Sequence, residues 1–477
     1  MTTFMSYSLA QSASRVKLPK NSKSFELKQN ASVAQLAKTN TSVFKSALKF
    51  NLTGMNYFSD SSADQSFQQN INLDLDVKGS RGEFFYKTQA VMGLYSEVHS
   101  DYYAVPEVFI GYGQTQNYKL TVGREIFIFN ELDQFSNLGL FNSYFSNDLI
   151  NYKMQGLIGL HFLMHQGGWG IQAGINPIYL PNQGPQVHEK DGHITSTNRW
   201  APRPPTEFQF NNENKPIQYA IRNYSFSEII FHPGETFSFF YGDSPQRPLV
   251  KLSYAYKPVN EIALSRENYG DTNKNMDVHV NLSPVVTYQT IKSVDFNLQP
   301  TNAVSTTLSY IDEQPYNQEA NEYETRQWLN PMKIYGITSS IDLQNFLNNP
   351  IHLILGYSIV EGGTIQDLTQ GREPGLFTFS KYRTQFQHPL TIGLQSENQF
   401  FKLKKATVTN VKWTYDQKVK GSLFSLNISQ EAFDQVRMNV GCDILGVRDI
   451  NDEVSVDSFL SKNQSHDRIF GGLEYVY

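Results

Sequence analysis

The chain has 477 residues, of which 39% are hydrophobic and 13% aromatic, with a formal net charge of -5 and a mean hydropathy of -0.43. This small net charge does not indicate an electrostatic partner such as nucleic acid. A membrane-spanning helix needs about 20 consecutive apolar residues. The best candidate, Leu157 to Met164, is shorter and is interrupted by His161. The composition therefore excludes a protein built from transmembrane helices.

Residues 1–46 form a polar amino-terminal segment before the first predicted strand. The segment lacks the basic region and long apolar run of a complete secretory signal. Ser8 to Ala13 nevertheless resembles the small-residue cleavage region of such a signal. We interpret 1–46 as a signal-peptide remnant followed by a periplasmic or plug segment. The alternative is a disordered tail.

From about Ala47 onward, short segments alternate apolar and polar side chains. In the first, Ile71, Leu73, Leu75 and Val77 alternate with Asn72, Asp74 and Asp76. The same pattern returns at 118–122, 169–176, 250–256, 277–282, 294–299, 424–428 and 436–440. A period of two predicts strands with one apolar face. The chain holds about 16 to 20 such segments, which is typical of single-chain barrels. We therefore predict an all-β fold, with residues 47–477 forming one closed antiparallel β-barrel.

Two long connections between the predicted strands stand out. Pro181 to Pro216 is rich in proline, which cannot donate to a strand ladder, so we expect an external loop. Asn130 to Asp148 is unusually aromatic. We expect it to fold inward as a constriction loop, with Phe135, Leu138, Phe141 and Tyr144 as its candidate residues. The alternative is a short amphipathic element on the rim.

The carboxyl-terminal stretch 468–477 alternates and ends on an aromatic residue, Tyr477. Ile469, Leu473 and Tyr475 share one parity, whereas Arg468 and Glu474 lie on the other. With the alternation along the whole chain, this ending resembles the closing strand of bacterial outer-membrane β-barrels of the porin-like superfamily. The resemblance implies a transmembrane barrel in the outer membrane of a Gram-negative bacterium. It implies contact with outer-membrane lipid, recognition of the last strand by the barrel-assembly machinery, and compatibility with a homo-oligomer.

In such a barrel the polar parities would face the lumen. The candidate pore-lining residues are Asp74, Asp76, Lys87, Lys119, Arg222, Lys251, Asp277, His279, Asp295, Lys412, Arg437 and Glu474. Because both signs of charge occur, the wall would tolerate small polar solutes rather than favour one class of ion. The alternative for any one of these residues is a solvated face with no role in selectivity.

The sequence contains no recognisable catalytic motif, cofactor motif or metal site. His161 and His165 could share a metal on a helix. On a strand, however, they would lie roughly 13 Å apart, too far for one ion. The single cysteine, Cys442, shares the apolar parity of Val436 to Val440 and is expected to be a packing or lipid-facing residue. We expect no enzyme activity, no cofactor and no metal.

The function that these patterns and the resemblance favour is a porin-like channel for passive diffusion of small hydrophilic solutes. A receptor or adhesin barrel is the main alternative, favoured if the lumen is blocked and the external loops are rigid. A barrel enzyme such as a phospholipase would need catalytic side chains that converge at one rim. A soluble β-sandwich or propeller would need the apolar parities buried against another sheet.

Overall fold

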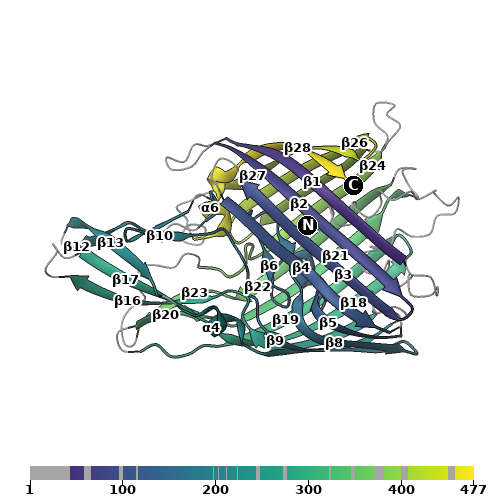
Figure 1. Ribbon diagram of the computed structural model, residues 1–477, viewed down its shortest axis with the longest axis horizontal. Helices are drawn as coiled ribbons and strands as arrows, with labels where there is room; N and C mark the ends of the chain where they lie inside the picture. Colours follow the sequence, from purple (N-terminus) through teal and green to yellow (C-terminus); the bar gives the residue numbers. More distant parts are fainter. Residues whose placement is uncertain are drawn as a thin grey trace.

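The computed structural model describes residues 43–58, 66–95, 100–113, 117–196, 198–201, 204–210, 212–222, 224–242, 248–271, 277–321, 324–344, 350–369, 381–398, 407–448 and 457–477. Within these ranges, eighteen strands pair antiparallel, each with its neighbour along the wall, and close into a barrel (Figure 1). Their bounds are β1 (Val43–Tyr57), β2 (Phe67–Arg81), β3 (Phe84–Tyr95), β4 (Ser100–Tyr112), β5 (Tyr118–Glu125), β8 (Leu157–Gln166), β9 (Trp169–Ile178), β14 (Gly234–Tyr241), β15 (Val250–Pro258), β18 (Tyr288–Thr301), β19 (Val304–Tyr316), β21 (Met332–Asp342), β22 (Ile351–Gly362), β24 (Pro389–Asn398), β25 (Thr407–Asp416), β26 (Gly421–Phe433), β27 (Val436–Val447) and β28 (Arg468–Val476). The predicted fold class is confirmed.

The barrel closes where its first and last strands meet. β1 pairs with β28 in an unbroken register that places Phe50 opposite Tyr475 and Leu52 opposite Leu473. Beyond β28, the backbone N–H of Tyr477 donates to Leu48. The prediction for the terminal strand is therefore confirmed. β1 begins at Val43, so the predicted boundary between residues 46 and 47 falls inside this strand. Residues 1–42 lie outside the described part of the chain, and their interpretation stays a prediction.

The two faces of the wall differ as the alternation predicts. On β2, Leu73 is 39% exposed, and on β28, Leu473 is 47% exposed. The other parity is mostly polar and largely buried, with Gln89 at 2% and Asp295 at 1%, and it also carries buried apolar residues such as Phe85 and Ile291. Cys442 lies on the outward parity of β27, with Met438, Val440 and Ile444. An outer surface of this apolar character is unfavourable in water, and a polar inner surface needs partners or solvent.

The connections differ at the two ends of the barrel. One end has short turns, such as Gly167–Gly168 between β8 and β9, where both glycines adopt the positive φ that the turn needs. The other end, at the left of Figure 1, carries the long connections. Their elements are α3 (Glu131–Phe135), β6 (Tyr144–Phe145), β7 (Lys153–Met154), β10 (His188–Lys190), β11 (His193–Thr195), β12 (Glu207–Phe210), β13 (Glu213–Ile221), α4 (Phe226–Ile230), β16 (Ala263–Asp271), β17 (Asp277–Val285), β20 (Glu324–Leu329), β23 (Ile365–Thr369), α6 (Phe459–Lys462) and η2 (Gln464–His466). Because the strand number is even, β1 starts and β28 finishes at the short-turn end.

Four of the long connections build a second sheet outside the barrel wall. Its strand order is β12-β13-β17-β16-β20-β23, and β13 runs parallel to β17 (Figure 1). Ile217, Tyr219, Val280 and Leu282 form its small core. This corrects the assignment of 277–282 to the barrel wall, because the apolar parity of β17 is buried against protein.

Aromatic side chains gather near both ends of the outer wall. Trp169 lies 4.5 Å from Tyr241 at the short-turn end, measured between ring centroids. At the other end, Tyr256 stacks on Tyr288 at 5.3 Å and lies 6.1 Å from Tyr316. Such rings suit a lipid–water boundary because one edge is apolar and the hydroxyl is polar. Among the described residues, no helix combines the length and apolar character needed to cross a bilayer.

Candidate functional site: an inward segment and the polar wall

Residues 126–156, which connect β5 to β8, run along the inner side of the barrel. Their apolar residues pack against inward-facing side chains of β15, β18, β19, β21 and β22. Phe129 stacks on Phe141 at 5.0 Å, and both are buried against Ile291 and Ile311 of the wall. The segment therefore reaches strands that are well separated from β5 around the barrel.

Polar side chains of the wall hold the start of this segment in place. Asp295 on β18 accepts from the side-chain amide of Asn130 at 2.6 Å and from the backbone N–H of Glu131 at 3.0 Å. On β15, Ser253 donates to the carbonyl of Phe129 at 2.7 Å, and Lys251 donates to that of Ile128. Asp295 and Lys251 thus bind backbone groups of the segment, which are costly to bury unpaired.

Two wall glycines provide the space for the helix of the segment. A Cβ at Gly336 on β21 would lie 2.6 Å from Leu132, and one at Gly356 on β22 would lie 2.3 Å from Phe135. Both distances are far below normal carbon–carbon contact. α3 can therefore approach the wall closely only because these two positions carry no side chain.

Asp133 stabilises the turn that follows α3. Its carboxylate accepts from the backbone N–H groups of Leu140 and Phe141 at 3.0 and 3.2 Å. Burial raises the pKa of Asp133 to about 6, although these two hydrogen bonds favour its ionised form. The carboxyl group of Asp133 thus links α3 to the backbone of residues 140 and 141.

A buried ionic cluster fastens the far part of the segment. Arg468, 1% exposed, lies 2.7 Å from Asp148 of the segment and 2.7 Å from Asp443 of β27. Its guanidinium also lies over the ring of Trp200, which comes from the connection between β9 and β14. Nearer β8, Lys153 pairs with Asp74 on β2 at 3.0 Å. The segment is therefore tied to opposite parts of the wall.

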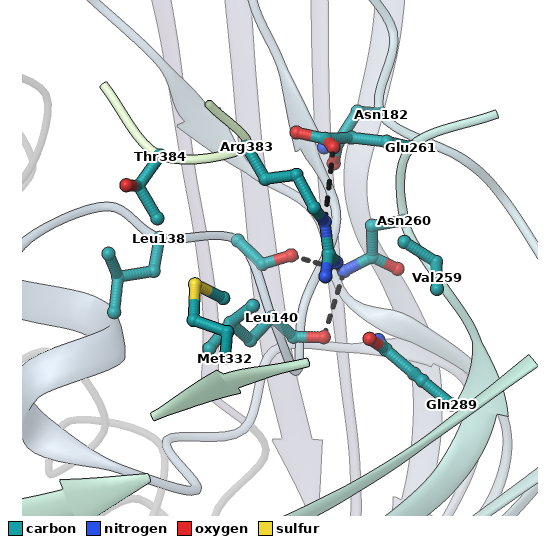
Figure 2. Close-up of a pocket in the computed structure, with 11 residues that line it drawn as sticks. Leu138, Leu140, Asn182, Val259, Asn260, Glu261, Gln289, Met332, Arg383 and Thr384 are labelled. Atoms are coloured by element: carbon teal, nitrogen blue, oxygen red, sulfur yellow. Dashed lines mark hydrogen bonds and ion pairs between the residues drawn. The ribbon is translucent and has the colours of Figure 1, made fainter. Parts of the chain in front are cut away.

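Arg383 ties the connection between β23 and β24 to the same region, as Figure 2 shows. It makes two hydrogen bonds to Glu313 of β19, at 2.8 and 2.7 Å, and lies 3.7 Å from Glu261. Beside it, Asn260 donates to the carbonyls of Gly139 and Leu140. Two connections and the inward segment thus meet at one buried arginine.

A cavity of about 50 Å³ lies between the inward segment and the wall formed by β22, β24, β25 and β26. Its lining includes Phe135, Leu138, Tyr144 and Tyr152 on one side and Thr391, Lys412 and Thr414 on the other. Lys412 makes no hydrogen bond or ion pair with any residue that the structure describes. The cavity thus combines two cations, Lys412 and Arg383, with several hydroxyl groups and aromatic rings.

The predicted site residues separate into several groups. Lys87 pairs with Glu107, Lys119 with Glu125, and Arg437 with Glu474, all on the inward face of the wall. Asp74, Asp295, Lys251 and Lys412 lie around the inward segment, and Asp76 is a neighbour of Asp74 on β2. Phe135, Leu138 and Tyr144 line the cavity, whereas Phe141 is fully buried and anchors the segment.

Three predicted wall residues lie elsewhere. Asp277 and His279 belong to β17 of the second sheet, and Arg222 is exposed just after β13. Their placement on the barrel wall was wrong, because alternation within β17 serves a protein core. The prediction also missed Arg383, Arg468 and Asp148. No periodic pattern marks them, since they lie on connections or at a strand end and meet partners distant in sequence.

The two histidines of β8 have different partners and do not face a common ligand, as expected for residues four apart on a strand. His161 and His165 both lie on β8, and His161 packs against Phe127 with its ring 4.7 Å away. His165 instead contacts the carbonyl of Gly242 at 3.0 Å. Across the described ranges, no group of histidine, cysteine and acidic side chains is arranged to hold a metal ion.

Comparisons with known proteins find distant likenesses among solved structures. No family model and no curated protein matches the chain. Among solved structures, OccK2 (OpdF) of Pseudomonas aeruginosa is 11% identical with a TM-score of 0.46, covering 91% of this chain and 97% of that one. OccAB4 of Acinetobacter baumannii is 10% identical with a TM-score of 0.45, covering 92% and 99%.

Proposed function

We propose that this protein is a bacterial outer-membrane channel through which small hydrophilic solutes diffuse passively. The observation that carries the proposal is the closed eighteen-stranded wall with apolar side chains exposed outward and polar side chains facing inward. A surface of this kind is stable in a bilayer, where closure leaves no strand edge without hydrogen bonds. The polar interior supplies a hydrated path.

The inward segment supports a narrowed path rather than a wide one. It fills part of the interior beside β15 to β22 and leaves the cavity beside β22 to β26. We propose that residues 126–156 act as the constriction and that solutes pass on the side of Lys412 and Tyr152. Small polar molecules suit this lining, because hydroxyl and ammonium groups can replace part of their water.

Reconstitution in planar bilayers tests the function directly. Purified protein should produce stepwise increases in conductance at constant voltage. Liposomes that contain it should swell in small sugars or amino acids but not in solutes too large for the constriction. Sealed bilayers and unswollen liposomes, from protein verified as folded, would rule out the channel while leaving the barrel intact.

Crowding the inward segment should increase conductance. Gly356→Leu places a side chain where Phe135 lies, so α3 should be displaced from the wall and the path should widen. Single-channel conductance should rise severalfold. Gly393→Leu on neighbouring β24, the register partner of Lys412, is the matched control: the same side chain is added to the inward face without meeting the segment, since the nearest atom to its Cβ is 3.6 Å away, so conductance should stay the same or fall. Equal conductance of both variants would contradict the constriction role.

Reversing the charge at Lys412 should change ion preference. Lys412→Glu puts an anion at a cavity whose described lining offers no acidic side chain. Reversal potentials in a salt gradient should then shift toward cation preference, most clearly at low salt, where screening is weak. Lys420→Glu, in the turn between β25 and β26, makes the same charge change away from the cavity. A shift of the same size in both variants would argue against Lys412 as a pore-lining residue.

A receptor or adhesin is the second candidate, and the second sheet is the observation that favours it. This sheet has its own core and lies beyond the long-connection end of the wall (Figure 1). A channel needs no such structure. Folded protein that binds to cells or phage but never conducts would favour the receptor.

A further inference from the structure

Four charged residues form a continuous ladder on the outward face of the barrel. Lys292 on β18 is paired in register with Asp312 on β19, Asp312 with Lys333 on β21, and Lys333 with Glu361 on β22. Lys292, Lys333 and Glu361 are exposed and Asp312 is half-exposed. Their signs alternate along the ladder.

The neighbours of the ladder confirm that it lies on the outer side. Ile291, Ile311, Ile334 and Val360, each adjacent in sequence to one of the four, are at most 1% exposed and face inward. Along the same outward rows, Tyr335 is 43% exposed, and its ring lies 5.1 Å from that of Tyr310. The charges thus share a face with residues suited to lipid.

Lys292 and Asp312 lie below an aromatic cluster rather than beyond it. Tyr316, at the end of β19, belongs to the cluster with Tyr256 and Tyr288, and Asp312 lies four residues nearer the short-turn end. With a strand rise of about 3.4 Å and the usual tilt, this is roughly 10 Å toward the membrane. Charges at such a depth are costly unless they are paired.

We propose that the outward faces of β18 to β22 form a two-fold contact with a second copy of this chain, in which Asp312 of each copy faces Lys333 of the other. A two-fold axis along the membrane normal that faces the gap between β19 and β21 would lie about 5 Å outside the wall, half of the roughly 10 Å that separates two packed sheet faces. The axis places Asp312 of each copy opposite Lys333 of the other, which gives two ion pairs. Because the ladder is inclined to the membrane, Lys292 and Glu361 of different copies lie at different depths, and each stays beside its register neighbour in its own chain.

The alternating signs favour a second copy over lipid headgroups. A phosphorylated headgroup would be attracted by Lys292 and Lys333 but repelled by Asp312 and Glu361, one strand away from them. A self-complementary surface satisfies both signs, as isologous contacts require. The contact needs only an outer face in lipid, so it can fail while the channel function holds.

Charge reversal and charge exchange test the contact. Folded wild-type protein should contain two chains per particle by light scattering in mild detergent and by native mass spectrometry. Asp312→Lys and Lys333→Asp each create two like-charge contacts and should yield one chain per particle. The double variant D312K/K333D restores opposite charges and should recover the dimer. A monomeric wild type, or a dimer unchanged by either single reversal, would overturn the proposal.

Cysteine cross-linking in the membrane gives an independent readout. On a Cys442→Ser background, Tyr310→Cys or Tyr335→Cys lies one outward position from the ladder and close to the axis. Oxidation should form a disulfide between the two copies of the chain in at least one of these variants. Val440→Cys on β27, where the outward positions are apolar, is the control and should remain uncross-linked. Equal cross-linking of all three would contradict a specific contact.

A monomer that retains phosphorylated lipid until Lys333→Asp is introduced would show that the ladder binds lipid headgroups instead, and would overturn the proposed contact.

Discussion

Leu73→Arg is expected to destabilise the folded barrel by about 2 to 4 kcal/mol if Leu73 lies at mid-bilayer depth. Leu73 is 39% exposed on the outward parity of β2, and Phe50 of β1 and Met92 of β3 are its register partners. An arginine there must keep its charge near hydrocarbon, and no acidic side chain shares this apolar row. Leu75→Arg, one outward position along the strand, should have a similar effect. Urea unfolding in lipid vesicles, followed by tryptophan fluorescence, measures the free energy difference.

The control for this prediction is an arginine on the other parity. Asn51 lies on the inward face of β1, opposite Glu474 of β28. Asn51→Arg should therefore change the unfolding free energy much less, because the new charge faces the polar interior beside Glu474, which already pairs with Arg437, rather than hydrocarbon. Equal destabilisation by the inward and outward arginines would mean that the two faces do not differ in environment.

Arg468→Met should cost about 3 to 5 kcal/mol, because it removes the cation that two buried carboxylates share. Asp443 is 4% exposed and Asp148 is 14% exposed at the side chain, and both lie 2.7 Å from the guanidinium. Methionine conserves much of the volume, so the loss is mainly electrostatic. Because Asp148 belongs to the inward segment, limited proteolysis should also cut residues 126–156 more rapidly.

A compensated variant separates the electrostatic effect from packing. Arg468→Met with Asp148→Asn and Asp443→Asn removes all three charges and should recover most of the lost unfolding free energy. If the triple variant is as unstable as the single one, the cluster acts through packing against Trp200 and Phe470 rather than through charge.

The barrel could be predicted because its physical signal is local. A strand between lipid and a polar interior must alternate, so segments such as 71–77 and 250–256 indicate their own structure. β28 was also predictable, because its alternation reaches the end of the chain. The inward segment was suggested by its aromatic content, since such residues between polar strands need something to pack against.

The second sheet and the ionic anchors could not be predicted in the same way. Val278, Val280 and Leu282 alternate as the wall strands do, but they are buried in a protein core, and alternation alone does not distinguish the two. The parallel pairing of β13 with β17 joins separate connections, which no local pattern indicates. Arg383 meets Glu313, 70 positions away, and Arg468 meets Asp148, much further still.

Thiol reactivity along β2 in sealed liposomes tests most directly whether one face of the wall meets lipid and the other water. Single cysteines replace residues 72 to 77 in a Cys442→Ser background and are exposed to a charged, membrane-impermeant thiol reagent. Positions 72, 74 and 76 should react rapidly, whereas positions 73, 75 and 77 should stay unreacted and, when labelled with a nitroxide, report contact with hydrocarbon. Equal reactivity of all six positions would contradict a transmembrane barrel.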